Sequence, residues 1–171
     1  MITGGWRGPG WKIVTGDQDQ ARPVRDWIRS AVSRHHCPVD PADVALAVSE
    51  LFANAVMHGP RGSRVLAGYC LWPAGARIVI CDGGGRTVPQ VRMDESLAEG
   101  GRGLQVINAL AAQWGSFRLP GAQAMWCDFG QPLRAPDTDA WAWLGSVLAT
   151  FPLRDSASCR SADQQALAGA R

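Results

Sequence analysis

Apolar residues recur at helical spacing in two segments of the first third of the chain. The first segment follows Pro23, which suits the first turn of a helix, and ends at the His-His-Cys-Pro run of residues 35–38. The second begins after Asp40, a favourable N-cap residue followed by Pro41, and ends at Gly59. The apolar faces predicted for these helices are Val24, Ile28, Ala31 and Val32 for the first, and Val44, Val48, Leu51 and Ala55 for the second.

Strand-like segments occur mainly in pairs. Strands are predicted at residues 11–14, 64–72, 77–81, 114–119 and 123–129. Turns at Pro73-Ala74-Gly75 and Pro120-Gly121 join the last four strands into two hairpins. A polar loop over residues 86–100 separates the hairpins, and glycines at 100–103 open a third helix. The apolar face of that helix is predicted to be Leu104, Ile107, Leu110 and Ala111.

This order of elements predicts an α/β fold, a two-layer α/β sandwich with a mixed, largely antiparallel sheet and helices on one face. Residues 11–131 form the predicted domain, after a loose, Gly-rich N-terminus over residues 1–10. Residues 132–153 hold an accessory helix, and residues 154–171 form a polar tail that we expect to be disordered. The accessory helix carries an apolar stripe that suits packing against the domain, with partner docking as the alternative: Trp141, Leu144, Leu148 and Phe151.

Composition narrows the function classes. The chain has 171 residues, 46% of them hydrophobic, and a formal net charge of +2. This charge gives no electrostatic case for direct binding to nucleic acid or to a membrane, and no apolar run approaches the roughly 20 residues of a membrane span. The five cysteines form no C-x-x-C pair, which favours a reducing, cytoplasmic setting. His35, His36 and Cys37 lack the second half of a zinc ligand pattern.

The second helix carries polar residues beside its apolar face, within the stretch ALAVSELFANAVMHG of residues 45–59. Glu50 and Asn54 are four residues apart, so they share one side of the helix at about 5–6 Å between β-carbons. A carboxylate can act as a general base, and an amide oxygen one turn away can ligate a hard cation such as Mg²⁺. An exposed polar face without a role remains the alternative for this pair alone.

Two glycine-rich motifs follow. In CDGGG, Asp82 ends an apolar strand, and the glycines allow the backbone a sharp turn and close approach to a ligand. An ionised carboxylate there can accept a hydrogen bond from an exocyclic amine such as that of adenine. In EGGRGLQVI, glycines directly before a helix expose backbone N–H groups suited to phosphate, and Arg102 can add a charged contact. A tight turn and a flexible loop are the simpler interpretations of these motifs.

In this order, the three motifs resemble the GHKL ATPase superfamily, which includes gyrase, heat-shock chaperone, histidine kinase and mismatch-repair ATPases. They are most similar to the small anti-sigma-factor-like serine/threonine kinases of bacteria. SELFANAVMHG matches the N box, CDGGG the first glycine box and GGRGL the second. The resemblance covers residues 11–129 and implies the Bergerat fold, with ATP and Mg²⁺ as cofactors.

The resemblance also implies residue roles. Glu50 is the expected catalytic base, and Asn54 the expected Mg²⁺ ligand. Asp82 is expected to bind the adenine amine, with Gly84 allowing the turn. The phosphates are expected to contact the second glycine box, at Gly101, Arg102, Gly103 and Leu104. His58, which closes the N box, is expected to have a structural or supporting role.

Departures from the family pattern bear on catalysis. Arg86 replaces the last glycine of a full D-x-G-x-G, and Gln105 stands where histidine kinases have another glycine. No phospho-acceptor histidine is recognisable, which excludes a whole histidine kinase. The last hairpin reads GAQAMW, without lysine or threonine, so phosphoryl transfer is less well supported than ATP binding.

The predicted function is therefore an ATP- and Mg²⁺-dependent, anti-sigma-factor-like serine/threonine kinase of bacterial partner switching. Its implied partners are a sigma factor or an anti-anti-sigma protein of the STAS type, and a homodimer is a further implied assembly. The alternative is an ATP-gated binding module without catalysis. A methyltransferase glycine loop is disfavoured, because it requires a parallel β-α sheet and the hairpin before CDGGG is antiparallel.

Overall fold

The computed structural model describes residues 7–84, 102–132 and 139–153. Within them, five strands form one sheet in the order β1-β2-β3-β5-β4, and every pairing is antiparallel. The strands are β1 (Arg7–Thr15), β2 (Arg64–Trp72), β3 (Gly75–Asp82), β4 (Gln113–Leu119) and β5 (Ala122–Gly130). The helices are η1 (Gln18–Gln20), α1 (Ala21–Arg34), α2 (Pro41–His58), α3 (Arg102–Leu110) and α4 (Asp139–Thr150).

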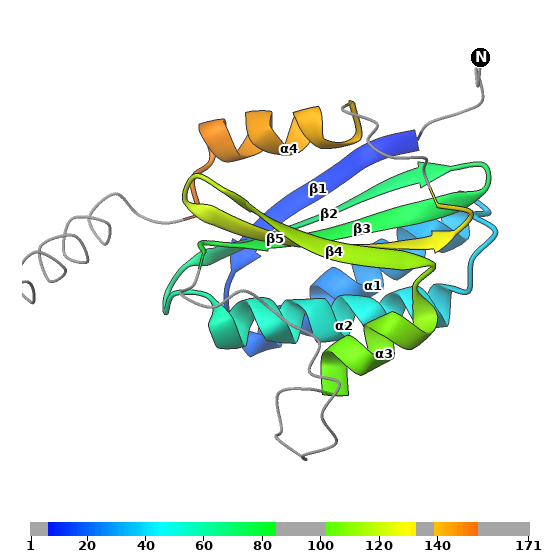
Figure 1. Ribbon diagram of the computed structural model, residues 1–171, viewed down its shortest axis with the longest axis horizontal. Helices are drawn as coiled ribbons and strands as arrows, with labels where there is room; N and C mark the ends of the chain where they lie inside the picture. The colour runs from blue at the N-terminus through cyan, green and yellow to red at the C-terminus, as the bar shows by residue number, and fades with distance from the viewer. Residues whose placement is uncertain (1–6, 85–101, 133–138, 154–171) are drawn as a thin grey trace, which may run out of the picture.

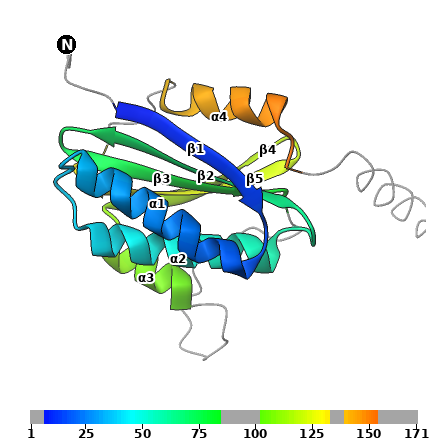
Figure 2. The same cartoon turned by 180° about the vertical axis from the view of Figure 1, so that it is seen from behind.

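Three helices cover one face of the sheet, and α4 lies on the other (Figures 1 and 2). The predicted α/β sandwich is therefore confirmed, and α4 adds a partial third layer to it. The main core fills the space between the sheet and helices α1 to α3. Every residue of the predicted faces of α1 and α2 is buried, and all of them except Ala31 belong to this core.

The limits of α2 follow from local chemistry. The Asp40 side chain accepts a hydrogen bond from the Ala42 N–H at 2.7 Å, which satisfies one of the unpaired donors of the first turn. Asp43 adds a negative charge near the positive end of the helix. At the other end, the N–H of Gly59 bonds to the carbonyl of Ala55 and closes the last turn.

The N-terminal strand is longer than its sequence predicted. β1 begins at Arg7, so residues 7–10 are part of the sheet and not of a loose segment. The run Gly8-Pro9-Gly10 disfavours a strand locally. However, β1 lies at the edge of the sheet and pairs on one side only, and edge strands are where sheets tolerate proline. A register irregularity between Arg7 and Gly10 accommodates this run.

The helix α4 packs on the sheet, as the first interpretation of its apolar stripe expected. Among the α4 side chains that the structure describes, Leu144 and Val147 are buried, and they share a cluster with Leu66, Val79 and Cys81 of the sheet. The side chain of Trp141, also predicted for the stripe, lies outside the described residues. Phe151 was predicted to belong to the stripe, but it lies beyond the helix, is 44% exposed and contacts the Trp11 ring. The helix stops there because Pro152 disfavours helical backbone at the preceding residue.

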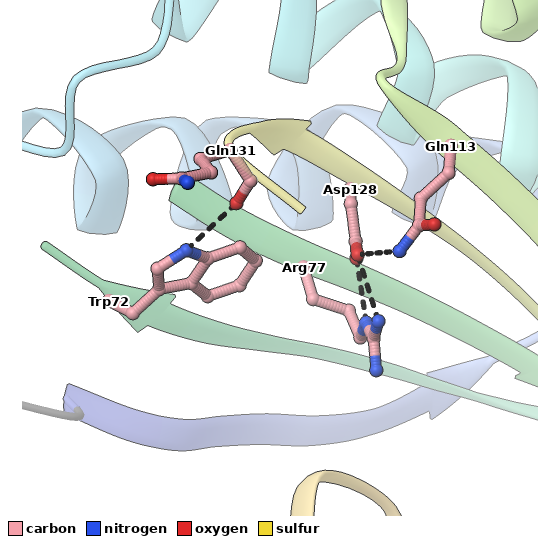
Figure 3. Close-up of polar contacts among 5 residues, drawn as sticks. All are labelled: Trp72, Arg77, Gln113, Asp128 and Gln131. Atoms are coloured by element: carbon pink, nitrogen blue, oxygen red, sulfur yellow. Dashed lines mark hydrogen bonds and ion pairs between the residues drawn. The ribbon is translucent and has the colours of Figure 1, made fainter. Parts of the chain in front are cut away.

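A polar cluster is buried in the sheet face that carries α4 (Figure 3). The guanidinium of Arg77 donates two hydrogen bonds to the carboxylate of Asp128, at 2.6 and 2.8 Å, and Gln113 donates a third at 2.7 Å. The Asp128 side chain is fully buried, and the Arg77 guanidinium stacks on the Trp126 ring. Each charge is therefore paired, which a buried ion requires.

Candidate functional site

The helix α2 presents Glu50 and Asn54 beside its buried face. Both residues are half-buried, whereas Leu51 and Ala55 between and after them are in the core. The side-chain nitrogen of Asn54 is buried and has no hydrogen-bond partner within the described part of the chain. An orphaned buried amide is costly in a folded protein, so this group marks a position where a ligand can complete the contacts.

The beginning of α3 lies directly against Glu50. A β-carbon added at Gly103 would lie 2.6 Å from Oε2 of Glu50, so only glycine fits here without displacing the carboxylate. The Leu104 side chain is buried in the core, so a ligand contact by this residue can come only from its backbone. The first turn of a helix offers such backbone N–H groups. α2 and α3 therefore bring a carboxylate and a helix N-terminus together.

Asp82 ends β3 on the face that packs against the helices, as the alternation from Ile78 and Ile80 requires. One carboxylate oxygen accepts a hydrogen bond from the N–H of Gly84 at 2.6 Å. This turn needs glycine at position 84, where φ is +75°. Asp82 is 7% exposed as a residue, so it is held at the edge of the core and not in bulk water.

The end of α2 closes the site on the side of Asp82. A β-carbon at Gly59 would lie 3.2 Å from the β-carbon of Asp82, so these two residues are in contact distance. Glu50 and Asn54 lie along α2 and Gly59 directly follows it, with Gly103 near the middle of the helix and Asp82 near its end. The site is thus elongated, with Asp82 and the N-terminus of α3 at different points along α2. Asp82 offers acceptors that suit a polar ring, and the N-terminus of α3 offers donors that suit an anionic group.

Gln123 belongs to this neighbourhood, although its sequence context did not single it out. It lies directly opposite Asp82 in the pairing of β3 and β5 and is 3% exposed. Its side-chain nitrogen donates to the carbonyl of Phe117 at 3.2 Å, and its oxygen accepts from Arg118 at 3.2 Å. Pairing the last strand with β3, residue by residue, could have identified Gln123 from the sequence.

Some of the predicted site residues cannot be placed. Gly101 and the loop over residues 86–100 lie outside the described residues, as does the side chain of Arg102. Arg102 is the first residue of α3, so its backbone is at the helix N-terminus as expected. His58 is exposed in the last turn of α2 and faces away from the core.

The chemistry of these groups suits a nucleotide with a hard cation. Asp82 supplies only acceptors, which match an exocyclic amine, and the N-terminus of α3 supplies donors, which match phosphate. Glu50 and Asn54 supply oxygen ligands of the kind that Mg²⁺ prefers. In the described ranges, no group of three or more His, Cys, Asp or Glu side chains forms a candidate metal site.

Two observations concern the surroundings of the site. Burial raises the pKa of the Cys81 thiol, the neighbour of Asp82, far above its ordinary value, which makes it a structural residue and not a nucleophile. In addition, no helix among the described residues is long and apolar enough to cross a membrane.

A family model described as the histidine kinase-like ATPase domain matches residues 14–122. No curated protein matches the sequence. The matching solved structures include the crystal structure of the RsbU and RsbW domains of Rv1364c from Mycobacterium tuberculosis. That match has a TM-score of 0.54 and 20% sequence identity, and it covers 75% of this chain and 34% of that one. This chain therefore corresponds to about a third of the length of that structure.

Proposed function

This chain belongs to the histidine kinase-like ATPase domain family, and from this premise we propose that it is an anti-sigma-factor-like serine/threonine kinase of bacterial partner switching. The observation that carries the proposal is the contact between α2 and the start of α3, where Gly103 adjoins the carboxylate of Glu50. A base beside an anion-binding helix end is the arrangement that transfer of a phosphoryl group to a hydroxyl requires.

Nucleotide binding divides among three groups in this proposal. Asp82 accepts a hydrogen bond from the exocyclic amine of adenine, while the Gly84 N–H holds the other side of the carboxylate in place. Backbone N–H groups at the start of α3, with Gly101 and Arg102 beside them, bind phosphate oxygens. The Asn54 amide oxygen ligates Mg²⁺, and its orphaned nitrogen is satisfied by a phosphate oxygen or by water.

Glu50 performs the acid–base chemistry of the proposed reaction. Its carboxylate accepts the proton of the attacking serine or threonine hydroxyl, which makes the oxygen a better nucleophile. Bound ATP would transfer its γ-phosphoryl group to this oxygen and leave as ADP, and Mg²⁺ would offset part of the negative charge of the phosphates. Glu50 lies beside Gly103, so the proton acceptor is next to the helix end proposed to bind the phosphates.

A second function is favoured by a specific feature of the sequence. The last hairpin has no lysine or threonine near the proposed phosphate site, and positive charge around the γ-phosphate is a large part of catalysis. An ATP-gated binding module without significant kinase activity needs only the binding residues. In both cases the partners are a sigma factor or a STAS-type anti-anti-sigma protein, with a homodimer as the assembly.

The two functions separate at Glu50. Under the kinase hypothesis, Glu50→Ala abolishes phosphorylation of a STAS-type acceptor but retains ATP affinity, whereas Asn54→Ala and Asp82→Ala lose both. Under the binding-module hypothesis, Glu50→Ala leaves control of the partner intact, and Asn54→Ala and Asp82→Ala destroy it. Transfer of radiolabelled phosphate from ATP to the acceptor, measured beside ATP affinity, decides between them. Failure of the wild type to bind ATP contradicts both.

A further inference from the structure

The helix α4 supports the strand end that carries Asp82, from the opposite face of the sheet. Cys81 directly precedes Asp82, and its side chain points the other way, into the cluster beneath α4. Val147 and Leu153 belong to that same cluster and are both buried. The helix α4 and the segment after it therefore pack behind the strand end that carries Asp82, on the opposite face from the site.

A second connection runs through Arg64. The backbone N–H of Arg64 bonds to the carbonyl of Leu153 at 3.0 Å, and its guanidinium bonds to the carbonyl of Pro152. Arg64 begins β2 directly after the short segment of residues 59–63, which starts at Gly59 against Asp82. The end of α4 is thereby joined to the segment that closes the site beside Asp82.

The first half of α4 has a shaped seat on the sheet, at Trp143. A β-carbon at Gly68 would lie 2.6 Å from the Trp143 ring, so the absence of a side chain at Gly68 makes room for this ring. A specific seat at one end and the Arg64 clamp at the other give α4 one defined docked position.

We propose that α4 regulates base recognition at the nucleotide site, with Arg64 as a positioning residue that acts through Leu153 and Gly59. This inference rests on the proposed role of Asp82 in binding adenine. When α4 is docked, the carboxylate is held where it accepts the adenine amine and repels the carbonyl oxygen that guanine has in its place. When α4 is released, Asp82 is less well positioned, and the preference for ATP over GTP decreases. Capture of α4 by a partner would weaken ATP binding without contacting the nucleotide.

The test compares the affinities of fluorescent ATP and GTP analogues, with Mg²⁺, for full-length variants. Arg64→Ala removes the side-chain clamp, and Val147→Ala loosens the packing under α4. Their matched controls are Arg22→Ala, an exposed arginine with one ion pair on α1, and Val32→Ala, an equally truncated core valine on the other face. Asp82→Asn serves as the reference for lost base recognition.

We expect the wild type to prefer the ATP analogue about tenfold, the effect of one hydrogen bond to a charged group. Arg64→Ala and Val147→Ala reduce this preference by about fivefold, at the lower end of typical coupling between two sites, and both controls retain it. A general loss of stability weakens the binding of both nucleotides equally and leaves the ratio of their affinities unchanged. By reciprocity, saturating ATP slows hydrogen exchange of the α4 amides in the wild type.

An unchanged ATP-to-GTP ratio in Arg64→Ala and Val147→Ala, with α4 exchange unaffected by ATP, overturns the inference while the proposed function stands. A wild type that binds neither nucleotide overturns the proposed function, and this inference with it. These two failures are therefore distinguishable in the same experiment.

Discussion

Substitution of Gly103 by alanine is predicted to impair the reaction without harming the fold. The new β-carbon would lie 2.6 Å from Oε2 of Glu50, and ordinary van der Waals contact needs about 3.5 Å. The carboxylate must therefore move by about 1 Å, which it can do because it is the end of a flexible side chain. A misplacement of about this size costs on the order of 10²-fold in turnover.

The stability of this variant is expected to hold. Gly103 has no positive φ, so alanine adds no backbone strain, and it restricts the unfolded chain more than glycine does, by about 0.4–1 kcal/mol, which offsets the cost of moving Glu50. The N–H of residue 103 is retained, so ATP affinity is expected to change by less than about tenfold. The affected quantity is kcat, with a small change in the binding constant.

A matched control exists in α4. Gly145 is also a helical glycine, and a β-carbon there meets nothing within 4 Å. Gly145→Ala is expected to raise the melting temperature slightly and to leave turnover at the wild-type level. The assay measures phosphoryl transfer under saturating ATP and Mg²⁺, beside nucleotide affinity and thermal unfolding. Full turnover in Gly103→Ala would refute the placement of Glu50 at the reacting group, and so would an equal loss in Gly145→Ala.

Three further predictions concern the fold. Arg77→Met leaves the fully buried Asp128 carboxylate with Gln113 as its side-chain donor among the described residues, and we expect a loss of about 3–5 kcal/mol in the free energy of unfolding, measured by urea denaturation. A loss below about 1 kcal/mol would contradict the buried pair. Asp40→Ala removes the N-cap bond to Ala42 and should cost about 0.5–2 kcal/mol in the same assay, where no change would contradict the cap. Burial raises the pKa of the Cys70 thiol from 9.0 to about 11, so the folded chain keeps its proton while the unfolded chain loses it. The contribution of Cys70 to stability is therefore full below pH 9.0 and declines as the pH rises towards about 11. A Cys70→Ala variant whose free energy of unfolding declines over this pH range as steeply as that of the wild type would contradict this.

Much of the fold follows from local patterns in the sequence. The limits of α2 were predictable because Asp40, Pro41 and Gly59 each act through the backbone next to them. The hairpin of β2 and β3 follows from its turn and two apolar runs. The early start of β1 and the loss of Phe151 from the α4 stripe were not predicted, because sheet pairing and a following proline overrode local preference.

The site divides in the same way. Glu50 and Asn54 share a helix side by spacing alone, and Asp82 could be placed at a strand end. The contact of Gly59 with Asp82, and the position of Gln123 opposite it, depend on how elements distant in sequence are registered. The pairing of Arg77 with Asp128 also depends on the register of the strands. Two opposite charges within apolar strands nevertheless suggest a buried ion pair from the sequence.

The most direct test of nucleotide binding at this site is a calorimetric titration of the wild type and Asp82→Asn with ATP, with and without Mg²⁺. We predict that the wild type binds ATP, that Mg²⁺ strengthens the binding, and that Asp82→Asn weakens it about tenfold or more through loss of the adenine contact. Absence of ATP binding by the folded wild type, or equal affinity in Asp82→Asn, would contradict the assignment.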